Sequence, residues 1–259
     1  MTDNAPLQYR EATIAKLELL WGEGFMSVGG PAEVSAICHG VDLTGLDILD
    51  IGCGIGGVDF LLVKEHGAAS VLGLDVSQHL LDLGRLRAER AGLSDKVSFR
   101  LCASPPYPVP DQHFDVVFSK GSILHIPDKF GLFWDLARCL KPGGMFIASD
   151  WLKGDGAEVA GAMTRFGAAE ITLESAPASE MEAAMREAGF TCVEMGDQTE
   201  QYLKIARQDL SRMKGRLRTK AIELLGDEGF ESWISAQAGT VARLAERQVQ
   251  PTHIRAVLR

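Results

Sequence analysis

Two hydrophobic patterns alternate along residues 47–151 of the chain. Short apolar runs of strand length end at glycine or polar residues, and longer stretches with helical spacing lie between several of them. Strands are expected at 47–52, 70–77, 97–103, 114–121 and 144–151, and helices at 58–67, 77–91 and 129–140. Strands that alternate with helices through short turns predict a Rossmann-like, doubly wound α/β fold with a mostly parallel sheet.

Both ends of the chain depart from this alternation. Helical spacing of Ile14, Leu17 and Leu20 predicts a helix over 8–20, whereas the glycines of 21–30 exclude a regular helix there. Further elements are expected as helices at 31–39, 177–190 and 198–225, and as strands at 190–195 and 253–259. We therefore predict one domain with a seven-stranded sheet. Its parts are an N-terminal helical lid over 1–40, a ligand-binding core over 41–151, and a C-terminal helical cap with the last strands over 152–259.

Composition favours a small-molecule ligand over nucleic acid or membrane. The 259 residues are 46% apolar and 24% charged, which is ordinary globular usage and enough chain for one large α/β domain. A net charge of −9 repels nucleic acid and anionic lipid at long range. The sequence lacks an apolar run of about 18 residues and the apolar core of a signal peptide, so a cytoplasmic location is expected. A monomer or homodimer is expected as well.

Cysteine and histidine positions argue against metal and disulfide chemistry. The cysteines are scattered and never form a CxxC pair, so we expect buried, unpaired thiols and no metal site. The five histidines other than His125 show no metal-ligand spacing, and they are expected to be structural or to lie at the surface. The cysteines are Cys38, Cys53, Cys102, Cys139 and Cys192, and these histidines are His39, His66, His79, His113 and His253.

A glycine-rich turn after the first core strand carries the strongest chemical signal. Gly52 and Gly54 allow positive φ angles and close approach of a ligand to the backbone. Asp75, at the end of the next strand, suits the two hydroxyls of a ribose. With Gly57 the turn also fits GxGxxG, the dinucleotide fingerprint, which keeps a hydride-transfer enzyme as an alternative. Asp50 would repel a pyrophosphate but suits a cationic amino-acid ligand.

Several segments carry a resemblance to known enzymes. ARCLKPGGMFIASD (137–150) resembles the motif before strand five of class I methyltransferases. A closer resemblance, to the phosphoethanolamine N-methyltransferases, is carried by QYREATIAKLELLWGEGFMSVGG (8–30), LDIGCGIGG (49–57), FSKGSILHIPDK (118–129) and LKPGG (140–144). It covers residues 8 to about 151. It implies S-adenosylmethionine as the methyl donor and a small, phosphoethanolamine-like amine as the acceptor.

The resemblance also implies roles for individual positions. It makes His125 the catalytic base and places Tyr9 over the methyl-transfer centre. An ammonium acceptor must first lose a proton, and a histidine with an unperturbed pKa of about 6.5 is suited to accept it. The positions expected to bind the donor are Gln8, Tyr9, Ser27, Asp50, Gly52, Gly54, Asp75, Val76, Ala103, Ser104 and Lys120.

Three positions expected to bind the acceptor depart from the family pattern. The aspartate that the family pairs with its histidine is Gly121 here, the tyrosine after strand five is Trp151, and Arg165 is the only arginine of 152–177. These departures leave open methylation of sulfur or oxygen in a small metabolite, and a non-catalytic S-adenosylmethionine-binding module. The basic stretch 204–220 is expected to be a solvated helical face, with a wall that attracts an anionic substrate as the alternative.

Overall fold

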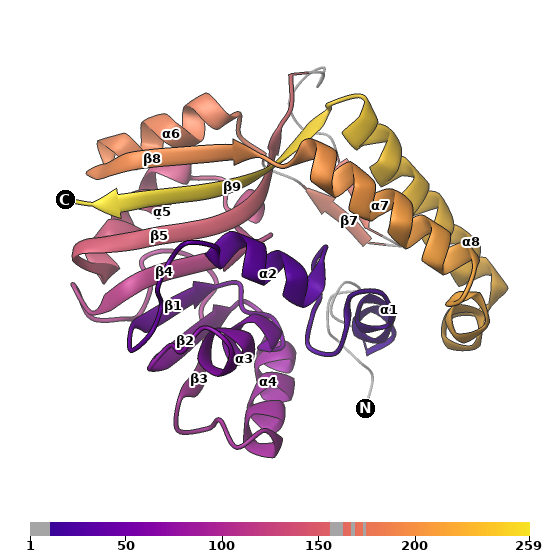
Figure 1. The fold of residues 1–259 in the computed structure, drawn as a ribbon, viewed down its shortest axis with the longest axis horizontal. Helices are drawn as coiled ribbons and strands as arrows, with labels where there is room; N and C mark the ends of the chain where they lie inside the picture. The colour runs from indigo at the N-terminus through magenta and orange to yellow at the C-terminus, as the bar shows by residue number, and fades with distance from the viewer. Residues whose placement is uncertain (1–10, 156–162, 167–168, 173–174) are drawn as a thin grey trace.

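A seven-stranded sheet forms the centre of the computed structural model, which describes residues 11–155, 163–166, 169–172 and 175–259 (Figure 1). The strand order is β3-β2-β1-β4-β5-β9-β8. The strands are β1 (Asp47–Ile51), β2 (Ser70–Asp75), β3 (Val97–Leu101), β4 (Phe114–Lys120), β5 (Leu140–Lys153), β8 (Phe190–Asp197) and β9 (Val249–Leu258). The first five run parallel, and β9 runs antiparallel to both β5 and β8. The prediction of a Rossmann-like, mostly parallel seven-stranded sheet is confirmed.

Helices cover both faces of this sheet. One layer consists of α2 (Gly30–Cys38), α3 (Gly57–Lys64) and α4 (Gln78–Arg90), and the other of α5 (Lys129–Cys139) and α6 (Ala178–Glu187). Neighbouring residues of β4 divide between the layers, since Val116 packs with the first and Val117 with the second. Successive strand side chains point to opposite faces, so a strand that is apolar throughout requires cover on both sides.

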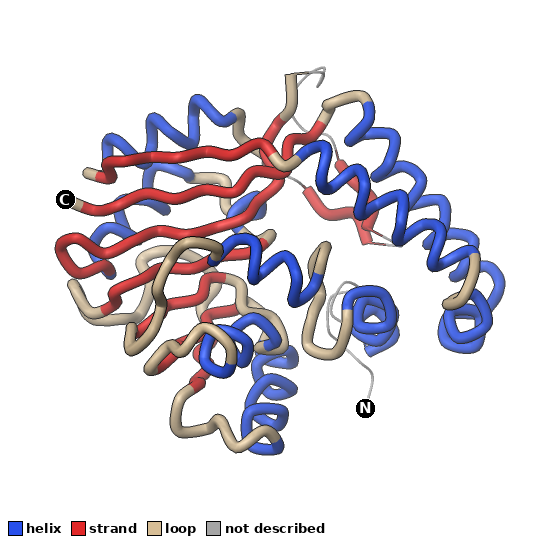
Figure 2. Tube along the Cα trace, viewed as in Figure 1, coloured by secondary structure: helices blue, strands red, loops and turns tan. Residues whose placement is uncertain are grey.

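A helical cap lies beyond the carboxyl ends of the parallel strands (Figures 1 and 2). It consists of α1 (Glu11–Trp21), α7 (Thr199–Lys214), α8 (Arg218–Ala245) and the hairpin of β6 (Met163–Phe166) with β7 (Ala169–Thr172). Leu20 of α1 packs with Met213 and Phe230 from the two long helices. The segment after α1 is therefore held between the sheet and the cap.

Some element predictions were wrong in detail. The stretch 198–225, predicted to be helical, forms α7 and the start of α8, and α8 continues beyond it to Ala245 with a non-helical residue at Gly226 (φ 71°). β9 begins at Val249, before the predicted start at 253. The hairpin was not predicted, because short strands within the weakly periodic stretch 152–178 leave no clear hydrophobic pattern.

The prediction that all five cysteines are buried was also wrong. Cys38, Cys53 and Cys139 are buried, Cys102 is half-buried and Cys192 is exposed, and all five are unpaired. Cys192 has a φ of 50° where the register of β8 against β9 shifts between Thr191 and Glu194. A bulge turns a side chain away from its expected face, which explains the exposed thiol.

No helix among the described residues is long and apolar enough to cross a membrane. In the same part of the chain, no group of three His, Cys, Asp or Glu side chains is placed to hold a metal ion.

Candidate functional site

The turn between β1 and α3 folds tightly at the carboxyl edge of the sheet. Gly52 and Gly54 have φ angles of 79° and 59°. The N–H groups of Gly52 and Cys53 donate to the carbonyl oxygen of Leu74 at 2.8 and 3.0 Å. A Cβ atom at Gly52 would lie 2.0 Å from the Oγ of Ser122 in the loop after β4. Position 52 therefore needs glycine both for its left-handed backbone and for the close approach of two loops.

Asp75 lies at the end of β2, beside this turn. Its Oδ2 accepts a hydrogen bond of 2.9 Å from Gly54 N, and its Oδ1 accepts one of 2.9 Å from Ser77 N. Burial raises the pKa of Asp75, while the backbone donors act in the opposite direction. Each carboxylate oxygen can accept more than one hydrogen bond, so the group keeps acceptor capacity for two neighbouring hydroxyls. The next residue, Val76, is 52% exposed and presents apolar surface at this edge.

Lys120 and Ser27, both predicted to bind the donor, come together at the end of β4. The Nζ of Lys120 donates to Ser27 Oγ at 2.5 Å and to the carbonyl oxygen of Val28 at 2.9 Å. Burial lowers the pKa of Lys120 to about 8, while Glu33 and Asp50 act in the opposite direction. The lysine thus fastens the segment after α1 to the carboxyl edge of the sheet.

Residues 22–29, the lid segment, pack directly on the glycine turn. A Cβ atom at Gly57 would lie 2.2 Å from the carbonyl oxygen of Gly24, and one at Gly54 would lie 3.6 Å from the sulfur of Met26. The N–H of Gly24 donates to Glu18 Oε1 at 2.6 Å, which ties the segment to α1. A ligand at the turn would therefore be covered by the lid segment and shielded from water.

We expect Gly57→Ala to weaken ligand binding at the turn about tenfold. The added methyl group meets backbone at Gly24, so the lid segment must move away from the turn, and a loss of about 1.4 kcal/mol corresponds to a factor of ten. Gly239→Ala is the matched control, because its Cβ meets only the end of the Arg243 side chain at 3.6 Å. Calorimetric titration compares the two variants. If both variants bind the ligand as tightly as the wild type, the contact between Gly57 and the lid segment does not affect binding.

His125 lies on a short 3-10 helix, Ile123–His125, and is exposed. Its backbone N–H donates to Ser122 O at 3.1 Å, and the preceding N–H, of Leu124, donates to Asp150 Oδ2 at 3.1 Å. Asp150 is 2% exposed, and burial raises its pKa to about 6 although the backbone donors of Trp151 and Leu124 oppose this. The buried aspartate positions the backbone that carries His125. Sequence reasoning did not select Asp150, although an acid that follows the apolar run of a central strand is a signal of function.

Gly121 stands where the family pattern has an aspartate. Its φ is 68°, and its N–H donates to Ser149 O at 2.8 Å. The left-handed backbone favours glycine, and an added Cβ would lie in ordinary contact with Ser27 at 3.8 Å. The loop before His125 is therefore built without a carboxyl group at position 121.

Trp151 faces the cap at the edge of the same site. Its ring lies 5.4 Å from that of Tyr202 on α7, with the ring planes at 83°. The hydroxyl of Tyr202 lies 2.9 Å from Ser149 Oγ and donates to Glu33 Oε1 at 2.7 Å. Glu33 also bonds His253 Nε2 at 2.6 Å. Burial raises the pKa of Glu33, but the bonds to His253 and Tyr202 outweigh burial and lower it. This buried network links α2 and the cap to β5 and β9.

The remaining predicted residues fall into two groups. Ala103 and Ser104 are exposed in the loop after β3, which Cys102 N ties to Asp75 O at 2.9 Å. That loop is thus at the same edge as the ribose candidate. Gln8 and Tyr9 lie outside the described residues, as does the side chain of Arg165.

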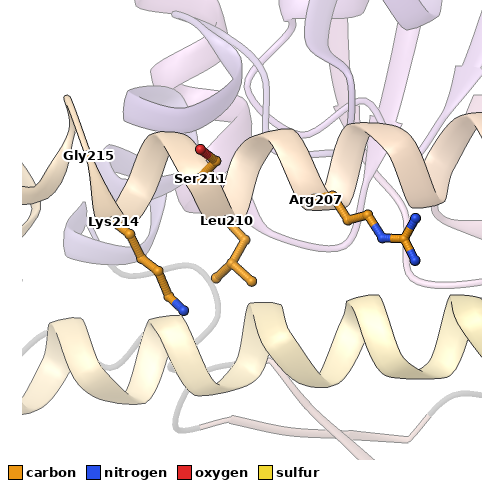
Figure 3. A pocket seen from close by; sticks show the side chains of 5 residues that line it. All are labelled: Arg207, Leu210, Ser211, Lys214 and Gly215. Atoms are coloured by element: carbon orange, nitrogen blue, oxygen red, sulfur yellow. The ribbon is translucent and has the colours of Figure 1, made fainter.

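An open surface pocket lies along α7, on different elements from the glycine turn (Figure 3). It is lined by Arg207, Leu210, Ser211, Lys214 and Gly215. Arg207 and Lys214 are exposed, as expected for a solvated helical face. The alternative, a wall that attracts an anionic substrate, stays a hypothesis.

The sequence of this chain is similar to those of known methyltransferases. Residues 48–144 match the family described as "Methyltransferase domain". Phosphoethanolamine N-methyltransferase 1 of Arabidopsis thaliana is 30% identical over 240 residues, covering 92% of this chain and 48% of the relative. Phosphoethanolamine N-methyltransferase of Triticum aestivum is 31% identical over 242 residues, covering 92% of this chain and 46% of the relative. The chain spans about half the length of the curated relatives it matches.

Solved structures share the fold. Haemonchus contortus phosphoethanolamine N-methyltransferase 2, in complex with phosphomonomethylethanolamine and S-adenosylhomocysteine, superimposes with a TM-score of 0.88 at 24% identity. The match covers 97% of this chain and 59% of that one. A putative sarcosine dimethylglycine methyltransferase from Galdieria sulphuraria gives a TM-score of 0.80 at 16% identity, covering 96% of this chain and 98% of that one.

Proposed function

We propose, from the match of residues 48–144 to a methyltransferase-domain family, that the protein moves a methyl group from S-adenosylmethionine to a small, phosphoethanolamine-like amine. The observation that carries the proposal is the glycine turn at Gly52–Gly57 with a buried carboxyl on each side, at Asp50 and Asp75. Relatives named phosphoethanolamine N-methyltransferases support the choice of acceptor.

The residues of the turn fit the donor on structural grounds. Asp50 Oδ1 is buried without a hydrogen-bond donor among the described residues, and Gly52 and Gly54 beside it have positive φ angles that leave the backbone of the turn open to a ligand. We assign the aminoacyl part of the donor to the turn and Asp50, and the ribose hydroxyls to Asp75. Val76 would contact the adenine ring through apolar surface, and Ala103 and Ser104 through the loop after β3. Ser27 and Lys120, with Gln8 and Tyr9, would hold the lid over the donor.

The chain's own part in the reaction is alignment, proton removal and exclusion of water. The bound donor supplies an activated methyl group on sulfur. His125 accepts the proton that an ammonium acceptor must lose, so that a lone pair faces the methyl carbon. The lid segment, fastened by Lys120, keeps water out. Alignment alone is worth as much as ~7–11 kcal/mol in favourable cases.

The acceptor side of the site is assigned to Gly121, Trp151, Arg165 and Tyr9. The ring of Trp151 presents a π face to a cationic amine, an interaction worth about 0.5–2 kcal/mol. Since Gly121 supplies no carboxyl partner for His125, a thiol or an oxygen acceptor is the rival within the same fold.

We place the working protein in the cytoplasm as a monomer or homodimer that does not bind nucleic acid. The net charge of −9 and the unpaired cysteines support this proposal. Within the domain we assign the lid to residues 1–40, donor binding to 41–151, and the cap with the last strands to 152–259.

One assay tests the proposed function. The protein is mixed with S-adenosylmethionine and panels of amines, thiols and carboxylic acids, and mass spectrometry measures S-adenosylhomocysteine and each methylated product. We expect both products with an amine that carries a phosphate group. Methylated thiols or acids alone would establish the rival reaction, and donor binding without any product would establish a non-catalytic module.

A further inference from the structure

Two buried carboxyls beneath the glycine turn have oxygens without a hydrogen-bond donor. Asp50, near the end of β1, is 1% exposed, and Asp59, in the first turn of α3, is 0% exposed. Within the described part of the chain, no other residue donates a hydrogen bond to Asp50 Oδ1 or to either carboxyl oxygen of Asp59. The two carboxyls lie within hydrogen-bonding reach of each other. Ionised carboxylates only accept hydrogen bonds, so two anions here would repel each other and leave these oxygens unsatisfied.

One shared proton removes both problems. A protonated carboxyl donates to its ionised neighbour, as expected for two acids in one buried site. Burial raises the pKa of Asp50 well above its ordinary value, and the nearby Asp59 and Asp75 raise it further. Burial raises the pKa of Asp59 to about 7. The ligand-free pair therefore carries one proton and one negative charge at neutral pH.

The charged neighbours do not supply a cation for this pair. Asp75 on β2 adds negative charge, and the buried thiol of Cys53 lies in the turn itself. Lys120 on β4 acts on Asp50 through its charge, but its Nζ hydrogen bonds go to the lid segment, and Glu33 on α2 also acts on it. Among the described residues, no cation hydrogen-bonds to either carboxyl, beside the turn assigned to an amino-acid ligand.

We propose that Asp50 and Asp59 form a proton-linked receptor for the ammonium group of the methyl donor, holding one proton when the donor is absent and releasing it to solvent when the ammonium arrives. This inference rests on the proposed function. The charge balances: the pair with one proton carries −1, and two carboxylates with one ammonium also carry −1. A buried site avoids a change in net charge, which is costly away from water. The resemblance gave no role to Asp59.

The linkage makes donor binding depend on pH. A proton on the pair competes with the ammonium, so the affinity for the donor falls as pH falls. Where the ligand-free pair holds its proton, simple competition weakens binding by up to about tenfold for each unit by which pH falls. In the same range about one proton is released for each ligand bound.

Calorimetric titration with S-adenosylhomocysteine, in two buffers of different ionisation enthalpy, counts the released protons. The compound keeps the aminoacyl group and is not consumed. We expect about one proton released for each ligand bound, and weaker binding at pH 6 than at pH 7. Binding without proton release at pH 6 and pH 7 would overturn the proton linkage and leave the proposed function intact. The absence of binding at both pH values would instead overturn the proposed function.

Asp59→Asn separates a proton-linked role from a structural one, with Asp82→Asn on the exposed surface of α4 as the control. Asparagine keeps the shape and donates to Asp50 without a titrating proton. We expect the variant to lose the pH dependence and to bind at pH 6 at least as tightly as the wild type. The variant could instead release as many protons as the wild type and bind the ligand more weakly by the same factor at both pH values. That result would show that Asp59 only supports the turn. The control is expected to behave like the wild type.

Discussion

Replacing Asp75 by alanine is expected to weaken the binding of S-adenosylhomocysteine about a hundredfold. The change removes the acceptor assigned to the ribose hydroxyls and leaves the N–H groups of Gly54 and Ser77, now 2.9 Å from the carboxylate, without partners. Hydrogen bonds to a charged group contribute roughly 1.5–3 kcal/mol each, and two of them account for a factor of about 100 or more. Calorimetric titration measures the loss.

The control for this change is Asp82→Ala. Asp82 lies on α4 with a side chain that is 62% exposed, and it pairs with Arg85 at the surface. Its removal should leave affinity unchanged, because exposed ion pairs contribute little. Wild-type affinity in a folded Asp75→Ala protein would show that the ribose is held elsewhere.

His125→Ala is expected to slow turnover of an amine acceptor by about 10²- to 10⁴-fold, the usual contribution of a general base. The short helix that carries His125 is held from below by Asp150, so the substitution should leave the surrounding backbone in place. Donor affinity should be unchanged, because the turn at Gly52 and the carboxyl of Asp75 are not altered. Initial rates from pH 6 to 9 and a donor titration measure the two effects.

His39→Ala is the matched control for the histidine, since His39 is exposed at the end of α2. Its turnover should equal that of the wild type. If His125→Ala also keeps the full rate on an amine acceptor across neutral pH, the assignment of His125 as base is wrong.

The core of the fold was predictable because its physical signals are local. Val116 and Val117 face opposite layers, so a strand that is apolar at both positions indicates a sheet covered on two sides. Glycine at positions 52 and 54 marks the tight turn, where positive φ angles of 79° and 59° are found. These features need no knowledge of distant residues.

The cap could not be predicted as well because its shape depends on distant contacts. The sequence indicated helical structure over 198–225 without a break, whereas α7 ends before Gly215, and Met213 and Phe230 of α7 and α8 pack with Leu20 of α1. Cys192 was expected inside, yet a register shift against β9 turns it outward. Strand and helix pairing of this kind is set by tertiary structure, and it has little effect on the spacing of hydrophobic residues along the chain.

Site residues at or near the ends of strands could be predicted from the sequence. Buried residues that support the site could not. Ser27 and Lys120, far apart in sequence, come together with Nζ and Oγ 2.5 Å apart. Asp59 was missed, although it shares a helical face with Leu62 and Val63, both buried. An acid on an apolar face was the available signal, and only the fold shows that it meets Asp50.

The most direct test of the account is a crystal structure of the protein with S-adenosylhomocysteine. We predict electron density for the homocysteine part against Gly52 and Gly54 with its ammonium at Asp50, and ribose hydroxyls within hydrogen-bonding distance of Asp75. Density for the nucleoside at another place, such as the α7 surface pocket, with the glycine turn covered only by the lid segment, would contradict the central claim.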